Sequence, residues 1–429
     1  MSLVIEHVQI YSPGSSLHGD TSIGIDAGQF VDPAQLSNSV VIDGRGWTLL
    51  PGLIDMRVNL REPGLEHKGT IASETRAALA GGVTTVVATP NTDPVIDTPA
   101  DVRLVLERAQ RAETCRVLPT GLITQGGDGH LLAEMMSLME AGTVALSQGD
   151  APFASTAIAL NALKYAASLD IPLILDPTLA DLRGGCAHSG RVATGLGLST
   201  NSPLSETLAV RLLLELIEVT RCRVHFSRLT TARAVQYIAN AKKRDLPVSC
   251  DVSLAHLLFD ETAIANLNPN FHLTRPLRTR HDRDALRQGV IEGVIDAIVS
   301  DHAPHEPGAK LAPFPETEPG MSMVECTLSA LYALDHDGLP FAHSLRAMTT
   351  SPAHLLGLDW LGQIEVGYTA DCVLVDPTGQ RVFDHAHWIS EGENSPYFQG
   401  VGMGQIHGIW VEGNDRTDRV SIGIRDDSR

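Results

Sequence analysis

The sequence predicts an α/β protein: an eight-stranded parallel barrel with a small β-domain built from both chain ends. Eight short apolar runs between residues 53 and 300 have the length and composition of buried strands, and helical stretches separate most of them. Both chain ends read as short strands with turns. Strands that alternate with crossover helices form parallel sheets, and eight of them close a TIM barrel.

Composition is that of a globular protein, with 43% hydrophobic and 19% charged residues in a chain of 429. The formal net charge of −19 argues against nucleic acid or an anionic membrane as a partner. No apolar run approaches the roughly 20 residues that cross a bilayer, and no export signal is apparent at the N-terminus. The six cysteines form no Cys-x-x-Cys pair, which is typical of reduced thiols. We therefore expect a cytoplasmic protein.

Residues 1–50 are expected to form the N-terminal part of the β-domain. Strand-like runs occur at Val4–Ile10, Ser22–Ile25 and Ser39–Ile42, and no amphipathic helix is evident among them.

Residues 51–358 are expected to form the barrel. The eight strand candidates are Leu53–Val58, Val83–Ala88, Arg116–Gly121, Thr143–Ser147, Ile171–Leu175, Arg223–Ser227, Pro247–Asp251 and Ile295–Ser300. Thr70 is placed to cap a first helix that Gly81 and Gly82 end. Further helices are predicted at Asp101–Ala112, His130–Ala141, Ser155–Ser168, Ser205–Thr220, Thr231–Lys243, Arg283–Glu292, Met323–Leu334 and Phe341–Met348.

Residues 359–429 are expected to complete the β-domain. Strands are predicted at Gly362–Val366, Cys372–Asp376 and Gly408–Glu412. Chain termini often lie close together, which favours one small domain made from both ends.

Chemistry in such barrels collects at the carboxyl ends of the strands. The first strand ends in Arg57 and Asn59, which alternation places on one face. The other polar residues at strand ends are Gln148 and Asp150 after the fourth strand, Asp176 after the fifth, Arg228 after the sixth and Asp301 after the eighth.

These residue types do not suit a metal ion. A hydrolytic metal site needs several neutral imidazoles or carboxylates, and a guanidinium has no free lone pair with which to bind one. We expect Arg57 and Arg228 to pair with Asp176 and Asp301, because charges are costly to bury without a partner. No zinc and no other cofactor is expected.

Several motifs together resemble the dihydroorotase family of the amidohydrolase superfamily, from Leu50 to about Gly413. They are Pro51–Asp55, Leu60–Gly64 with Glu66-His67-Lys68, Ala88–Thr92, Asp296–Ile298, Asp301–His305 and Gly362–Gly367. The set is specific, whereas any one motif alone is weak.

The resemblance implies a zinc site at positions where this chain departs from the family. The His-x-His pair of the first strand corresponds to Arg57 and Asn59, and the bridging carboxylate to Gln148-Gly149, with Asp150 displaced by a residue or two. The remaining histidines correspond to Asp176 and Arg228. Only the aspartate of the eighth strand is retained, as Asp301, and we expect it to be vestigial with no catalytic role.

The resemblance also implies a partly kept substrate site. Arg61 and Asn91 match the residues that hold the substrate carboxylate, and His305 matches a substrate histidine. A family asparagine is replaced by Thr274. Arg61, Asn91 and His305 either preserve a weak anion site or serve only in packing.

Two functions follow. The first is a noncatalytic homologue that serves as a structural or regulatory partner of aspartate carbamoyltransferase in pyrimidine biosynthesis, itself a homo-oligomer, most simply a dimer. The alternative is an active cyclic-amide hydrolase, of dihydroorotase or dihydropyrimidinase/hydantoinase type, with an atypical or single-metal site that uses Asp301, Asp176 or Asp150. An unrelated ligand-binding barrel is a third, smaller possibility.

Overall fold

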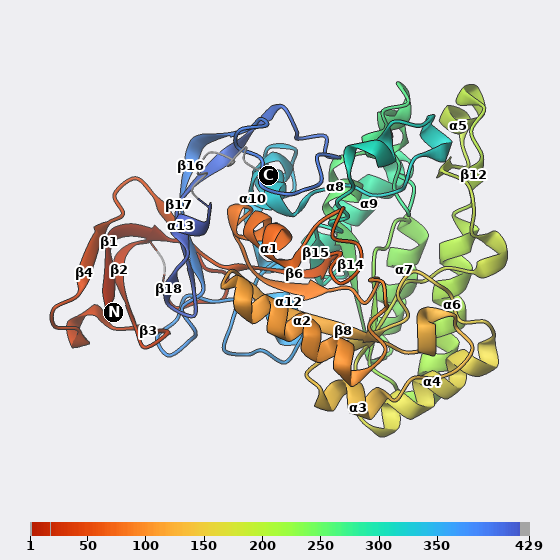
Figure 1. Ribbon diagram of the computed structural model, residues 1–429, viewed down its shortest axis with the longest axis horizontal. Coiled ribbons are helices and arrows are strands. Elements are labelled where there is room, and N and C mark those ends of the chain that lie inside the picture. Colours follow the sequence, from red (N-terminus) through yellow and green to blue (C-terminus); the bar gives the residue numbers. More distant parts are fainter. Residues whose placement is uncertain (1, 18, 421–429) are drawn as a thin grey trace.

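The computed structural model describes residues 2–17 and 19–420 and has two parts, an α/β barrel and a sheet made from the chain ends (Figure 1). The predicted segment 359–429 therefore extends past the described residues at positions 421–429. The exact domain boundaries remain a prediction.

The predicted barrel is confirmed. Its strands, in spatial order, are β6 Leu53–Val58, β7 Val83–Ala88, β8 Arg116–Leu122, β9 Ala145–Ser147, β10 Leu173–Leu175, β13 Val224–Phe226, β14 Val248–Ser253 and β15 Ala297–Val299. All neighbouring pairs are parallel. A parallel bridge between Val58 and His302 links the first strand to the chain just after the last one. The carboxyl ends of all eight strands therefore meet at one mouth.

Helices lie in the crossovers between the barrel strands and in the chain that follows the last of these strands. They are α1 Ile71–Ala80, α2 Pro99–Ala112, α3 Met135–Glu140, α4 Thr156–Ser168, α5 Arg191–Leu196, α6 Leu204–Thr220, α7 Ala232–Lys242, α8 Leu254–Leu258, α9 Arg280–Ile291, α10 Thr327–His336, α11 Phe341–Arg346, α12 Thr350–Leu355 and α13 Thr417–Val420. Thr70 caps α1 in a reciprocal capping box with Ser73, and Gly81 follows its last residue, as predicted. Among the described residues, every helix is too short or too polar to span a bilayer.

Three predicted helix starts were wrong by three residues or more. Helix α10 begins four residues later than predicted, after a 3-10 turn at Val324–Cys326. Helix α3 begins five residues later than predicted, because the chain before it forms a β-bridge between Thr124 and Leu132. Helix α9 begins three residues earlier, since Thr279 supplies a capping box with Asp282.

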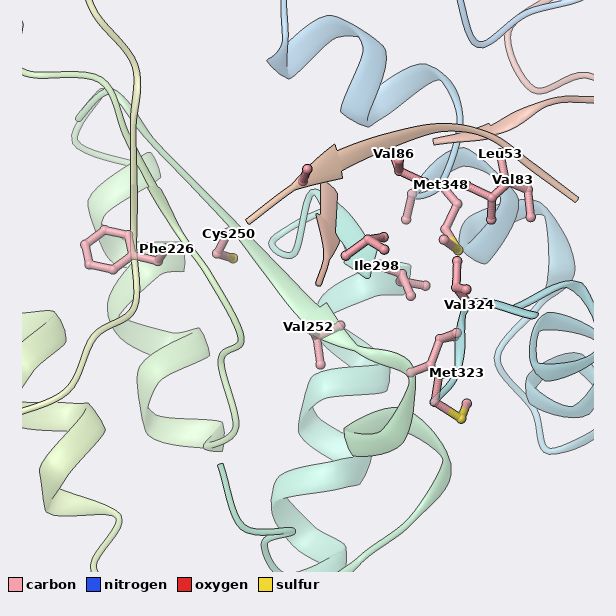
Figure 2. Packing of buried hydrophobic residues seen from close by; sticks show 14 of the residues in the cluster. Leu53, Val83, Val86, Phe226, Cys250, Val252, Ile298, Met323, Val324 and Met348 are labelled. Carbon is pink, nitrogen blue, oxygen red and sulfur yellow. The ribbon is translucent and has the colours of Figure 1, made fainter. Parts of the chain in front are cut away.

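The barrel core is aliphatic. Leu53, Val83, Val86, Ile298 and Met348 lie side by side at the seam between the first and last strands (Figure 2), and all are fully buried or nearly so. These side chains are removed from water over their whole surface, which is the main favourable term for the fold.

The second part is a mixed sheet built from both chain ends, with parallel and antiparallel strand pairs, at the left of Figure 1. Its strands are β1 Leu3–Ile10, β2 Gly19–Asp26, β3 Gln29–Val31, β4 Val40–Asp43, β5 Thr48–Pro51, β16 Cys372–Phe383, β17 Gly400–Val411 and β18 Asn414–Asp415. The ends are joined where β5 pairs antiparallel with β16. A separate pair, β11 Ala187–His188 and β12 Thr200–Asn201, lies in the insertion before α6.

The predicted strand at Gly362–Val366 was wrong. Ile364 is fully buried, but serine side chains satisfy its backbone. Its N–H donates to the Ser12 hydroxyl at 3.0 Å, and its carbonyl accepts from the Ser15 hydroxyl at 2.6 Å. The segment therefore needs no neighbouring strand.

Candidate functional site

Six charged side chains converge at the barrel mouth. They come from five strand ends or following loops and one longer loop, and we call them the arginine cluster: Arg57, Asp150, Asp176, Arg228, Arg275 and Asp301. Three guanidiniums face three carboxylates, so the charges of the cluster balance. Such balance is what buried charges require.

Arg57, near the end of β6, bridges two carboxylates. Its Nε lies 2.9 Å from Asp301 Oδ1, and its Nη2 lies 2.9 Å from Asp150 Oδ1. The side chain is only 4% exposed. The predicted pairing of this arginine with Asp301 is confirmed.

Arg228, which follows β13, contacts all three carboxylates. Its Nη2 donates to Asp150 Oδ1 at 2.5 Å and to Asp176, and its Nη1 lies 3.4 Å from Asp301 Oδ1. The predicted pairing with Asp176 and Asp301 is thus confirmed. Burial lowers the pKa of Arg228, but Asp301 and Asp150 more than offset this and raise it overall.

Two members of the cluster hold a left-handed backbone without being glycine. Arg228 has φ 57° and Asp301 has φ 50°. This region is uncommon for such residues, and strain of this kind concentrates at functional sites and their remnants. The tight turns aim both side chains back across the mouth.

Arg275 is a member that the sequence did not reveal. It is buried, forms an ion pair with Asp176 and donates to the Pro177 carbonyl at 2.9 Å. Burial, with the nearby Arg278, lowers its pKa to about 9. The residue lies in the long loop after α8, where no strand end marks it.

Asp150 is the carboxylate that ties the cluster together. Besides Arg57 and Arg228, it accepts from Asn91 Nδ2 at 3.0 Å. Burial raises the pKa of this carboxyl, but Arg228 and Arg57 outweigh burial and hold it well below its usual range. In the sequence, Asp150 is displaced by a residue or two from the position of the family's bridging carboxylate.

Asn59 and Gln148 lie at the mouth but outside the charge network. Asn59 Nδ2 donates to the His302 carbonyl at 2.7 Å, and its Oδ1 accepts from the Thr89 hydroxyl at 2.7 Å. Gln148 exchanges hydrogen bonds with the Thr124 hydroxyl. Both side chains connect loops at the strand ends.

The three predicted substrate residues have different hydrogen-bond partners. Asn91 is engaged with Asp150, while Arg61 donates from Nε to the Pro304 carbonyl at 3.0 Å and lies 3.2 Å from His305 Nε2. Burial, with Arg61 and Lys68, lowers the pKa of His305 to about 3, so its ring is neutral.

The zinc site implied by the resemblance does not fit this donor set. Arg57 and Arg228 have no lone pair to offer, and the carboxylates of Asp176 and Asp301 already accept from guanidiniums. The amide oxygen of Asn59 is occupied by Thr89. What the arrangement can do is hold an oxyanion among cations.

Comparison with known proteins gives the family. A model described as "Dihydro-orotase-like" matches residues 46–231, and an "Amidohydrolase family" model matches residues 215–415. The chain is 41% identical to a "Dihydroorotase-like protein" of Pseudomonas aeruginosa, over 96% of this chain and 99% of that one. It is 33% identical to a "Dihydroorotase" of Syntrophus aciditrophicus, over 96% of this chain and 98% of that one.

The fold is also that of a solved structure, the L-hydantoinase (dihydropyrimidinase) from Arthrobacter aurescens. The two superpose with a TM-score of 0.87 over 98% of this chain and 97% of the other, at 18% identity. The barrel with its terminal sheet is therefore a fold that the chain shares with the L-hydantoinase. On the family models and the relatives together, the chain belongs to the dihydroorotase-like family of the amidohydrolases.

Proposed function

We propose that this chain is a noncatalytic member of its family and serves as a structural or regulatory partner of aspartate carbamoyltransferase. The proposed loss of catalysis rests on the arginine cluster. In this cluster, guanidiniums occupy two positions at which the family has metal-binding histidines.

Hydrolysis of a cyclic amide needs an activated water, and a metal ion is the family's means of activating it. Here Arg57 and Arg228 fill the space between the carboxylates, and two fixed cations repel a divalent ion. Asp301 accepts from both arginines and is directed toward them rather than toward a substrate.

The partner is suggested by the family resemblance. A chain that keeps its barrel without the chemistry of its mouth acts through its surface, and permanent complexes bury large interfaces. A stable assembly with the transferase, and a homodimer within it, is the arrangement we propose in the cytoplasm.

The second candidate is an active cyclic-amide hydrolase with an atypical or single-metal site. It is favoured by the 33% identical relative named dihydroorotase and by the presence of Arg61, Asn91 and Asp301. For this candidate, Asp301, Asp176 or Asp150 would serve as the carboxylate of the reaction.

Co-expression with the transferase from the same source, followed by co-purification and mass measurement, tests the proposal. We expect one complex of defined stoichiometry at micromolar concentration. Separate elution of the two proteins would refute the partner role.

An assay of dihydroorotate and hydantoin hydrolysis, with and without added zinc, tests the loss of catalysis independently. We expect no turnover above the buffer rate and less than one zinc per chain. Turnover that disappears in Asp301→Ala would establish the second candidate instead.

A further inference from the structure

The three carboxylates of the arginine cluster differ in how they are held. The side chains of Asp176 and Asp301 are 5% and 17% exposed; Asp176 directly follows β10, and Asp301 lies two residues after β15. Asp150 is 35% exposed and belongs to the loop between β9 and α4. Of the three carboxylates, Asp150 is thus the one that solvent reaches most.

That loop, residues 149–155, which we call the strap, is shaped to deliver Asp150. Gly149 has φ 68°, and a Cβ at this position would lie 2.5 Å from Asn91 Oδ1. Only glycine combines that backbone with so close an approach. At its other end the strap is joined to the β8–α3 loop by the Ala154 N–H, which donates to the Gly129 carbonyl at 3.1 Å.

The groups around Asp150 form a cradle for one oxyanion. Guanidiniums of Arg57 and Arg228 reach one oxygen at 2.9 and 2.5 Å, and the Asn91 amide reaches the other at 3.0 Å. Paired guanidinium and amide donors are the preferred partners of a carboxylate.

The cradle does not depend on Asp150 for its shape. Asp301 holds Arg57, and Asp176 holds Arg228. Both arginines are at least 96% buried. Without Asp150 the cluster would keep three guanidiniums and two carboxylates, one positive charge in excess, in a place where unpaired charge is costly.

A cavity lies beside the strap and reaches the arginine cluster at Asp176, while the three donors of the cradle lie outside its lining. The cavity has a volume of about 210 Å³, and its walls include Phe153 of the strap, Leu179, Leu212 and Asp176. The strap therefore forms one wall of a cavity with mixed polar and apolar walls, so movement of the strap would change the shape of that cavity.

We propose that the mouth is an anion-binding site in which Asp150 is a tethered occupant, and that a small carboxylate from solution takes its place when the strap lifts. The ligand class is a monocarboxylate or the carboxylate end of a small organic acid. The inference rests on the arginine cluster alone, so it stands or falls separately from the assembly with a transferase.

A tethered group competes at an effective concentration in the millimolar range when its loop is short and flexible. External carboxylates are therefore expected to act at millimolar concentrations and above. Removal of the tethered carboxylate would raise the affinity of the cradle for them.

The test is chemical rescue of Asp150→Ala. The variant should melt several degrees below the wild type, and about 100 mM formate or acetate should restore at least half of that loss relative to sodium chloride of equal ionic strength. Glu107→Ala is the matched control, because it removes a carboxylate from Arg111 at the surface, where both side chains are more than half exposed. Its Tm should not respond to formate.

Hydrogen exchange of the wild type gives a measurement that needs no variant. Formate should speed exchange of the Ala154 amide at least twofold, because lifting the strap breaks its bond to Gly129, while amides of β13 stay unchanged. Formate that leaves this exchange unaltered, or that stabilises Asp150→Ala no more than Glu107→Ala, overturns the proposal.

Discussion

Two buried polar clusters lie on the same side of the barrel and satisfy their charges in different ways. The arginine cluster sets three guanidiniums against three carboxylates. The second, which we call the glutamate cluster, sets the carboxylate of Glu74 against the donors of Ser73, His302, Ser390 and the Glu391 backbone.

In the glutamate cluster each oxygen has two defined donors. Glu74 Oε2 accepts from His302 Nε2 at 2.8 Å and from the Ser390 hydroxyl at 2.6 Å, and Oε1 accepts from the Glu391 N–H at 3.0 Å and the Ser73 hydroxyl at 2.9 Å. The cluster joins α1, the chain after β15 and the segment before β17.

The arginine cluster joins the strand ends by charge and leaves one carboxylate exposed to solvent. The arginine cluster and the glutamate cluster therefore stabilise buried charge by different means. The stability of the glutamate cluster depends on hydrogen-bond geometry. The stability of the arginine cluster depends on charge balance, so every change of charge there should alter the free energy of unfolding.

Replacement of Arg228 should have the largest effect. Arg228→Met removes the cation that contacts all three carboxylates and leaves them with two guanidiniums, so we expect a loss of about 3–5 kcal/mol in the free energy of unfolding. Urea denaturation measures it. Arg244→Met is the control, because Arg244 pairs with Glu218 on the surface, and it should change stability by no more than about 0.5 kcal/mol. Equal losses in the two variants would remove the distinction between buried and surface charge.

On acidification, protonation of His256, a neutral neighbour of the arginine cluster, should lower the free energy of unfolding before protonation of the cluster's own carboxylates does. Burial lowers the pKa of His256 to about 4. Below pH 6.5 this imidazole is therefore protonated in the unfolded chain but stays neutral in the folded chain until about pH 4. The stabilisation is complete above pH 6.5 and is lost between pH 6.5 and 4, by roughly 3 kcal/mol. Because the pKa of Asp150 is depressed, its contribution is lost only below the ordinary carboxylate value of about 4.

The measurement is the difference in unfolding free energy between wild type and His256→Asn from pH 7 to pH 4. A difference curve is needed, since burial raises the pKa of Asp55 to about 7 and that group acts with the opposite sign. We expect the difference to shrink steadily on acidification. A difference that is constant with pH would show that His256 is not the titrating group.

In the glutamate cluster a change of charge without a change of shape should cost less. Glu74→Gln turns one acceptor oxygen into a donor that faces two other donors, and about 1–3 kcal/mol is the expected loss. Thermal and urea unfolding both report it, with Glu107→Gln as the surface control. A loss as large as that of Arg228→Met would mean that charge, and not hydrogen-bond geometry, governs this cluster as well.

The sequence predicted the barrel and much of its mouth, because strand ends carry local signals. The apolar runs before Arg57, Asp176 and Arg228 place these residues at the mouth without any further information. Arg275 had no such signal, since a loop position is fixed only by the fold around it. The contact of Glu74 with Ser390 spans 316 residues and has no local pattern at all.

The smallest effect is expected at the rim, where the loop after β15 is fastened to the barrel. Lys68 Nζ pairs with Glu318, and Glu306 lies 3.9 Å from the same nitrogen. Glu318 is half exposed, so water screens the pair, and Glu306 remains as a partner after substitution. Glu318→Gln should therefore lower the free energy of unfolding by no more than about 1 kcal/mol, and less at high salt. Urea denaturation measures this loss. A loss larger than that of Glu74→Gln would show that charge balance also governs the stability of the rim, and not only that of the arginine cluster.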